Sequence, residues 1–384
     1  MLGQSFNMSN MGKVHMEIMY LIFSFNVGGI ERLLVDMTSK ECEKGYKPLV
    51  CIINDDYDAE LVKTFDEKVE LIFLGRENGK NLIKYMAKFA SIVKSRKVNI
   101  LHCQGINCVL FSLFAKLINR KMVIINTVHD VGNYPSYSNL KLFVQGLILD
   151  STVAISKAVE QEILARENRK RVITIYNAVD LDKFKKSTKV FDKNNVMVGN
   201  VARFYPQKKG QDILVRAIKK INDKEGYEVT CKFAGEVFKE QDHDYERIVE
   251  YISENSLENK IIMCGGVDNI PAFLNQLDLF VLPSRYEGFG IALIEALAMG
   301  IPVVASDIDG PKEIYDLAKQ ENVDIGYLAK TGDDEDVCKK IKMCLVKYSQ
   351  YDKNSIREFV SRHFSIEHMV EQHLLLYSSL LKRK

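Results

Sequence analysis

Short apolar runs alternate with amphipathic stretches along the first half of the chain. EIMYLIFSF, PLVCII, VELIFL, NILHC, MVIINTVH, STVAIS and RVITIY are apolar at nearly every position, whereas IERLLVDMTSKECEK, NLIKYMAKFASIVKSRK and KAVEQEILARE carry apolar residues at helical spacing. Strands that are apolar throughout are typical of a parallel sheet covered by helices on both faces. The alternation therefore predicts repeated β-α-β units.

The same pattern begins again after a polar, Lys-rich stretch. NVMVGNVARF, YEVTCKFAG, KIIMCGG, DLFVLP, IPVVAS and VDIGYLA predict strands, with one helix starting at about Gln211. We expect an α/β protein with two doubly wound, Rossmann-like parallel-sheet domains at 13–182 and 196–365. Residues 1–12 would be a flexible leader and 183–195 a linker. The helical tail would end in a helix at about 366–384 that crosses back to the first domain.

Ligands of such sheets bind beyond the carboxyl ends of the strands, so two facing domains would enclose a central cleft. In the first domain a strand runs into Gly28 and Gly29, and paired glycines let the backbone approach a phosphate or a sugar closely. His129 ends another strand. Both features also fit purely structural roles, and both interpretations stay open. The absence of GxGxxG disfavours a nicotinamide cofactor.

Two cations follow the first strand of the second domain. Arg203 lies at the strand end and Lys209 directly precedes the next helix, whose N-terminus is its positive pole. A forked guanidinium beside a point ammonium suits a diphosphate. We therefore predict a diphosphate clamp from Arg203 and Lys209, and a solvated side chain for Lys208.

The stretch RYEGFGIALIEALAMG opens as a Gly-rich turn and continues as an apolar helix. The amides of Phe289, Gly290 and Ile291, after Gly288, would point from the helix start toward an anion. Carboxylates accept hydrogen bonds from neighbouring sugar hydroxyls, so Glu287 could hold a hexose and Glu295 a ribose. The alternative for Glu295 is an ion pair with a buried arginine.

EGFGIALIEALAMGIPVVAS resembles the Glu-x7-Glu motif of retaining GT-B glycosyltransferases, in particular family 4. The GGIE turn, His129, VARFYPQKKGQD and SDIDGPKEI extend the resemblance over essentially the whole chain. It implies Glu287 on the donor sugar, Glu295 on the ribose, and Arg203 and Lys209 on the diphosphate. Gly28 and Gly29 would border donor and acceptor, and His129 would touch the sugar near the reaction centre.

The resemblance implies transfer of a hexosyl group from a nucleotide diphosphate sugar, a UDP-sugar in the first instance, with retention by front-face attack. The catalytic residues would then be Arg203, Lys209, Glu287 and His129. Asp309-Gly310 replaces the common Gly-Gly of one loop and leaves the sugar's identity open. We expect no cofactor and no metal, and interpret Asp307-Ile308-Asp309 as a chance match to a metal-binding DxD. A nucleotide-sugar 2-epimerase and a catalytically silent scaffold are the alternatives.

Composition and charge limit the binding partners and the cellular location that we expect. Lys+Arg 53 against Asp+Glu 51 gives a net charge of only +2, which does not favour nucleic acid. The eight scattered cysteines indicate reduced thiols, and no apolar run approaches the ~20 residues of a membrane span. Six basic residues between Lys80 and Lys97 predict either a solvated helix face or contact with an anionic membrane. We therefore expect a cytoplasmic enzyme, peripheral at the membrane in the second case, that extends a glycan or lipid-linked glycan in bacterial surface polysaccharide synthesis.

Overall fold

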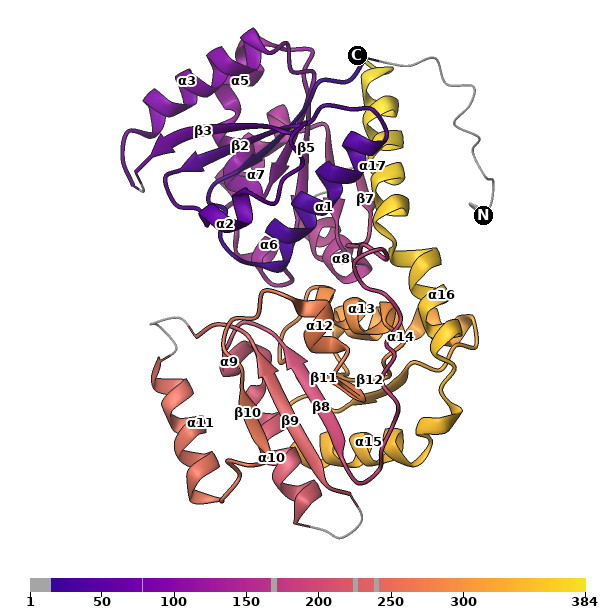
Figure 1. Ribbon diagram of the computed structural model, residues 1–384. Helices are drawn as coiled ribbons and strands as arrows, with labels where there is room; N and C mark the ends of the chain where they lie inside the picture. The colour runs from indigo at the N-terminus through magenta and orange to yellow at the C-terminus, as the bar shows by residue number, and fades with distance from the viewer. Residues whose placement is uncertain (1–14, 78, 167–170, 224–226, 238–241) are drawn as a thin grey trace.

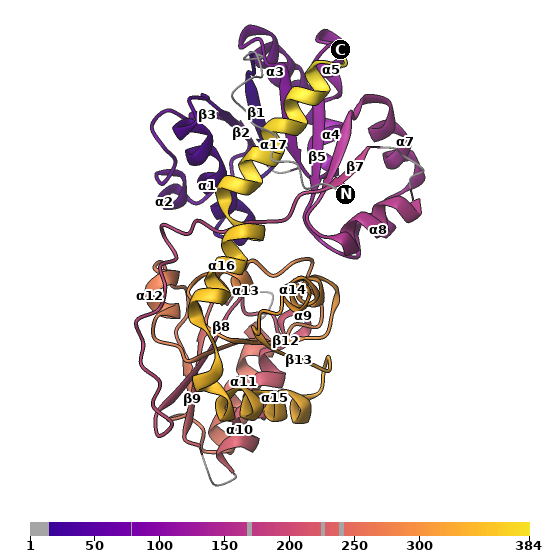
Figure 2. The same cartoon turned by 90° about the vertical axis from the view of Figure 1, so that its right-hand side faces the viewer.

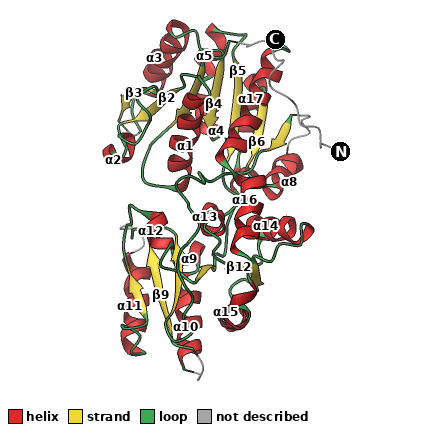
Figure 3. Cartoon of the chain, turned by 45° about the vertical axis from the view of Figure 1, so that its right-hand side comes forward, coloured by secondary structure: helices red, strands yellow, loops and turns green. Residues whose placement is uncertain are grey.

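The computed structural model describes residues 15–77, 79–166, 171–223, 227–237 and 242–384. Within these residues the strands form two all-parallel sheets, one in each half of the chain. The two halves lie one above the other, with their sheets flanked by helices (Figures 1 and 3). The predicted pair of Rossmann-like, doubly wound sheets is confirmed. The expected leader at 1–12 lies outside the described residues.

The first sheet has the strand order β3-β2-β1-β4-β5-β6-β7 and the second has the order β10-β9-β8-β11-β12-β13. The first contains β1 (Ile18–Ile22), β2 (Leu49–Asn54), β3 (Glu70–Arg76), β4 (Ile100–Gln104), β5 (Val123–Val128), β6 (Ser151–Ala154) and β7 (Val172–Thr174). The second contains β8 (Val196–Val201), β9 (Val229–Ala234), β10 (Ile261–Met263), β11 (Leu279–Leu282), β12 (Val303–Ser306) and β13 (Gly326–Ala329). In both sheets the chain reverses its direction of travel beside the first strand, which is where such folds bind ligands.

Helices fill the crossovers between the strands. The first domain contains α1 (Gly29–Glu43), α2 (Ala59–Val62), α3 (Leu82–Ser95), α4 (Ile106–Phe111), α5 (Leu113–Ile118), α6 (Asn133–Ser136), α7 (Asn139–Ile148) and α8 (Lys157–Arg166). The second contains α9 (Pro206–Lys209), α10 (Gln211–Asn222), α11 (Asp242–Glu254), α12 (Ile270–Leu274), α13 (Ile291–Ala298), α14 (Asp309–Gln320), α15 (Asp334–Val346) and α16 (Lys353–Phe364). The last helix is α17 (Ile366–Leu381).

Alternate residues of the first sheet serve two separate cores, as the period-2 geometry of a strand requires. Along β1, Ile18 and Tyr20 pack in a core with α1 and α17, whereas Met19 and Leu21 pack in a core with α3, α4, α5 and Ile148 of α7. Both faces of β1 are therefore covered, which explains why all five residues of this strand are buried.

The C-terminal helix returns to the first domain, as predicted, and α17 crosses its sheet in Figure 2. The backbone of Val179, leaving the first domain, exchanges hydrogen bonds with Phe364 (2.8 Å) and Ile366 (3.1 Å) as the chain comes back. The hydroxyl of Tyr377 on α17 then lies 2.6 Å from His102 Nδ1 inside the first domain. The chain therefore passes between the two domains twice, and the two passing segments are hydrogen-bonded to each other at Val179.

Candidate functional site

Loops at the carboxyl ends of the two sheets meet between the domains, and glycine sets their closest approach. A Cβ on Gly288, before α13, would lie 3.0 Å from the main-chain oxygen of His129, which follows β5. A Cβ on Gly29, the first residue of α1, would lie 3.3 Å from Ile291 Cδ1. The predicted donor loop of the second domain therefore packs directly on the two loops that the sequence singled out in the first.

Glu287 and Lys209 form an ion pair at this junction. Lys209 Nζ donates to Glu287 Oε2 over 2.8 Å, and the Ser284 hydroxyl lies 3.4 Å from the same oxygen. The two charged side chains are 21% and 15% exposed, so water screens the pair only in part. The structure thus places one predicted sugar ligand against one half of the predicted clamp, at the end of α9.

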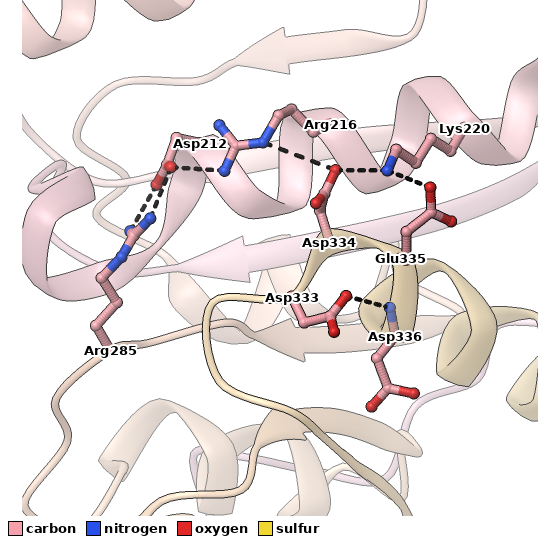
Figure 4. Close-up of polar contacts among 8 residues, drawn as sticks. All are labelled: Asp212, Arg216, Lys220, Arg285, Asp333, Asp334, Glu335 and Asp336. Atoms are coloured by element: carbon pink, nitrogen blue, oxygen red, sulfur yellow. Dashed lines mark hydrogen bonds and ion pairs between the residues drawn. The ribbon is translucent and has the colours of Figure 1, made fainter.

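A second ion pair holds the loop that carries Glu287. Arg285 donates hydrogen bonds from Nη1 and Nη2 to the two Asp212 carboxylate oxygens, both at 2.8 Å (Figure 4). The main-chain N–H of Arg285 donates to Lys208 O over 2.8 Å. Burial alone would raise the pKa of Asp212, but hydrogen bonds from Arg285 and Arg216 bring it below its usual range. This bidentate pair fixes the Glu287 loop to the start of α10 and is a positioning contact that the sequence analysis missed.

The start of α13 is shaped by two glycines. Gly290 caps the helix at φ 100°, in the left-handed region that favours glycine. A Cβ on Gly310, in the first turn of α14, would lie 2.6 Å from both the N and the Cα of Phe289. The first amides of a helix have no acceptor within the helix. The N–H groups of Phe289, Gly290 and Ile291 lie at this helix start, where a bound anion would meet them.

Glu295 lies one turn into α13 and faces α1 of the other domain. Burial raises its pKa to about 7, the nearby Arg32 offsets part of that rise, and Asp36 adds to it. Asp36 in turn pairs with Lys183. The charge of Arg32, in the opposite domain, therefore acts on Glu295, and the ribose and ion-pair interpretations of Glu295 both stay open.

Gly28 makes room for Glu31 at the start of α1. A Cβ on Gly28 would lie 2.4 Å from Glu31 Oε2, so the carboxylate curls back over the glycine toward the helix N-terminus. Burial raises the pKa of Glu31, while its own backbone N–H and the charge of Arg203 lower it. The guanidinium of Arg203 thus acts on a carboxylate across the domain boundary, and the GGIE turn and the predicted clamp belong to one electrostatic site.

His129 is half-buried, and its imidazole is neutral at neutral pH. Burial lowers its pKa to about 4, and its Nε2 lies 2.7 Å from Gln104 Oε1, which can only accept. Nε2 therefore carries the proton, and Nδ1 is a buried acceptor that has no hydrogen-bond partner among the described residues. At neutral pH this side chain can donate or accept a hydrogen bond, but it supplies no positive charge.

One expectation for this region was wrong. Lys208 is not simply solvated, because its Nζ lies 3.2 Å from Asp130 Oδ1 in the opposite domain. A second cross-domain contact is made by Glu313, which accepts from the Tyr176 hydroxyl at 2.6 Å and from the Lys157 amide at 2.8 Å. These partners follow from how the domains face each other, which no local pattern encodes.

In the ranges that the structure describes, no group of three or more His, Cys, Asp or Glu side chains could hold a metal ion. Asp307 of the DxD-like stretch pairs with Lys312 at 3.1 Å, and Asp309 opens α14. No described helix is long and apolar enough to cross a membrane.

Two family models together match almost the whole chain. The model described as Glycosyltransferase Family 4 matches residues 27–183, and the model described as Glycosyl transferases group 1 matches residues 180–356. The chain belongs to the group 1 glycosyltransferases. The domain junction of the two models, at 180–183, falls where the chain leaves the first sheet of this glycosyltransferase.

Two relatives and one solved structure are similar to this chain over most of its length. N-acetyl-alpha-D-glucosaminyl L-malate synthase of Bacillus anthracis is 26% identical over 77% of this chain and 78% of its own length. UDP-Gal:alpha-D-GlcNAc-diphosphoundecaprenol alpha-1,3-galactosyltransferase of Escherichia coli is 24% identical over 68% and 70%. The structure of Anabaena HepE in complex with UDP-glucose superposes with a TM-score of 0.78 at 23% identity, covering 95% of this chain and all of that one. At that identity the structural likeness shows the GT-B fold alone.

Proposed function

We propose that this glycosyltransferase transfers a hexosyl group from a UDP-sugar to a hydroxyl of a glycan or lipid-linked glycan, with retention at the anomeric carbon and without a metal. Its relatives support the choice of substrates. The Escherichia coli relative is named for a UDP-galactose donor and a diphosphoundecaprenol-linked acceptor, and the Anabaena neighbour binds UDP-glucose. A Staphylococcus aureus relative that is named as a capsular polysaccharide biosynthesis glycosyltransferase, 26% identical over 60% of this chain, supports a role in bacterial cell-surface polysaccharide synthesis.

The observation that carries the proposal is the ion pair of Lys209 and Glu287 at the start of α13. A diphosphate on the loop amides would lie beside the Lys209 ammonium, and a sugar beyond it would meet the Glu287 carboxylate. Arg203 would bind the diphosphate from the other side, and Glu295 the ribose. Gly28 and Gly29 would let the donor pass close to α1.

The chemistry would rest on charge stabilisation. When the bond to the anomeric carbon breaks, negative charge grows on the β-phosphate, where Arg203, Lys209 and the first amides of α13 would stabilise it. The same phosphate would take the proton of the attacking acceptor hydroxyl, so that attack and departure occur on one face of the sugar. Neutral His129 would hydrogen-bond the sugar without adding charge.

Thermal unfolding with UDP, GDP or ADP, each with and without EDTA, tests donor class and metal dependence together. A ligand at about 100 times its Kd adds ~2.7 kcal/mol, a shift of a few degrees for a chain of this size. We expect UDP to raise the Tm equally in EDTA. A rise with another nucleotide would reassign the base, a rise that EDTA abolishes would refute the metal-free site, and no rise at all would refute nucleotide binding.

Turnover of labelled UDP-hexoses then tests the clamp. Arg203→Ala and Lys209→Ala should each lower kcat by about 10²-fold or more, as loss of a group that stabilises growing charge does. Lys208→Ala is the matched control, since it removes the same charge from the neighbouring position, whose ammonium pairs with Asp130. Near-wild-type kcat in both clamp variants would refute the assignment. A product of inverted anomeric configuration would refute retention.

A further inference from the structure

The described large apolar side chains with the greatest exposure are concentrated on one side of the first domain. Eight of these side chains are more than 60% exposed, and five of the eight lie on α3, α5 and α7. The five are Ile83, Leu117, Leu140, Phe143 and Leu147, with exposures between 61% and 71%. Single exposed apolar residues are ordinary on protein surfaces, but a concentration on one helical layer marks an interaction surface.

The three helices form one layer. Met86 and Phe89 of α3, Ala115 of α5 and Ile148 of α7 share the core on the same face of the first sheet, while α1 and α17 cover the opposite face. Because the buried sides of α3, α5 and α7 point to the same sheet face, their exposed sides point outward together. Figure 2 shows the three helices on the upper domain.

The apolar stripe on α7 is the sharpest part of this surface. Leu142, Gln145 and Ile148 form the buried side of α7, and Leu140, Phe143 and Leu147 form the exposed side at spacings of three and four. A surface helix of a globular domain normally turns its polar residues outward. This helix is apolar on both sides, and the surface side has no protein partner among the described residues.

The same surface is strongly basic. Residues 78–149 contain ten Lys or Arg and one acidic residue, Asp130, which faces the other domain. Three of the ten pair with acids outside the segment: Lys80 with Glu77, Arg96 with Glu70, and Lys116 with Asp150. Exposed basic side chains remain on or beside all three helices, namely Lys84, Lys94, Lys97, Arg120, Lys121 and Lys141.

We propose that the layer of α3, α5 and α7 binds the surface of an anionic lipid bilayer, with Leu140, Phe143 and Leu147 entering the boundary between head groups and acyl chains. An apolar stripe flanked by Lys and Arg is the composition of helices that lie in this boundary. A second copy of the chain is a poorer occupant, because a two-fold contact would place this basic surface against itself. The acceptor would then reach the enzyme from the membrane, an extension that rests on the proposed function.

Co-sedimentation of the full chain with vesicles tests the surface. We expect binding to vesicles containing phosphatidylglycerol, weak binding to pure phosphatidylcholine, and a fall in binding as salt rises. The triple variant Leu140→Gln, Phe143→Gln and Leu147→Gln should bind at least about tenfold more weakly. A control variant, Val346→Gln, removes a comparably exposed apolar side chain from α15 in the second domain and should bind as the wild type does.

A second variant tests charge without touching the stripe. Lys84→Gln, Lys94→Gln and Lys121→Gln together should lower binding to anionic vesicles and leave the residual binding to phosphatidylcholine unchanged. Wild-type binding in the triple Gln variant of α7, or no binding of the wild type to anionic vesicles, would overturn the proposal. Light scattering that shows a wild-type dimer and a monomeric triple variant would assign the stripe to a second copy instead.

The thermal shift with UDP separates this result from the proposed function. Each variant alters only exposed side chains away from the donor loops, so UDP should stabilise all of them as it does the wild type. Vesicle binding without a UDP shift would leave the membrane surface standing and refute the donor. A UDP shift without vesicle binding would support the donor and refute the membrane surface.

Discussion

The pKa of Glu295 predicts a pH dependence of donor binding. Burial against α1 raises this pKa to about 7, whereas an unperturbed glutamate titrates at about 4.3. A carboxylate can accept from both hydroxyls of a ribose, and a protonated carboxyl loses part of that capacity. If Glu295 binds the ribose as proposed, donor affinity should fall as Glu295 becomes protonated, which happens below neutral pH.

The size of the effect follows from the ionised fraction. With a pKa of about 7, the carboxylate is about 90% ionised at pH 8 and about 10% ionised at pH 6, and an apparent Kd scales inversely with the competent fraction. The Kd should therefore rise by up to about tenfold between pH 8 and pH 6, with half of the affinity lost at pH 7. Above pH 8 the Kd should be constant.

Calorimetric titration with a UDP-sugar is the suitable assay. UDP itself is unsuitable, because its terminal phosphate titrates near pH 6, as singly esterified phosphates do. Glu295→Gln keeps the other titrating groups of the chain and should bind the donor more weakly, with no dependence on pH from this residue. A wild-type Kd that is flat between pH 6 and pH 8, or an equal slope in the Gln variant, would refute the ribose assignment.

Two further predictions concern substitutions of Glu41 and of Gly310. Glu41 is buried in α1, accepts from the Tyr20 hydroxyl at 2.6 Å and has a pKa that burial raises to about 8. The folded chain holds this proton more tightly than the unfolded chain, so Glu41 lowers stability by up to about 1.4 kcal/mol per pH unit as pH rises from ~4.3 toward 8. The Tm of Glu41→Gln minus the Tm of the wild type should therefore increase from pH 5 to pH 8. Tm curves of the two proteins that run parallel over this pH range would contradict this. In Gly310→Ala a Cβ 2.6 Å from the backbone of Phe289 should cost about 1–3 kcal/mol and weaken UDP binding, whereas the Cβ of Gly29→Ala meets only the side chain of Ile291 and should cost less stability. Equal Tm values for the two alanine variants would contradict a backbone clash.

The fold could be predicted from the sequence because its signals are local. Continuous apolar runs such as PLVCII indicate strands buried on both faces, and the return of the pattern after residue 195 indicates a second domain. The Gly-rich turn before an apolar helix was also predicted, and the structure has this helix as α13, with Gly290 as its left-handed cap. Short elements such as α9 escaped prediction, since four residues carry too little periodicity to register.

The partners of the site residues could not be predicted in the same way. Arg32 lies on a helix of the first domain and its proximity to Glu295 depends on how two separately folded sheets face each other. The same holds for Lys208 and Asp130. A sequence pattern reports which side chains share a face of one element. Contacts between domains depend on the angle between them, which the linker and α17 set jointly.

The charges proposed to bind the donor already lie against opposite charges of the protein. Lys209 pairs with Glu287, Arg203 acts on Glu31, and Glu295 lies near Arg32. A donor diphosphate would compete with the carboxylates at the first two places, so its net affinity is the difference between two sets of charge interactions. Two of the three internal contacts span the domain boundary, and exchanging them for ligand contacts would couple donor binding to the contact between the domains. The bonds of Glu313 to Tyr176 and Lys157 also span the boundary but involve none of these charges, so they can keep the domains in register while the exchange takes place.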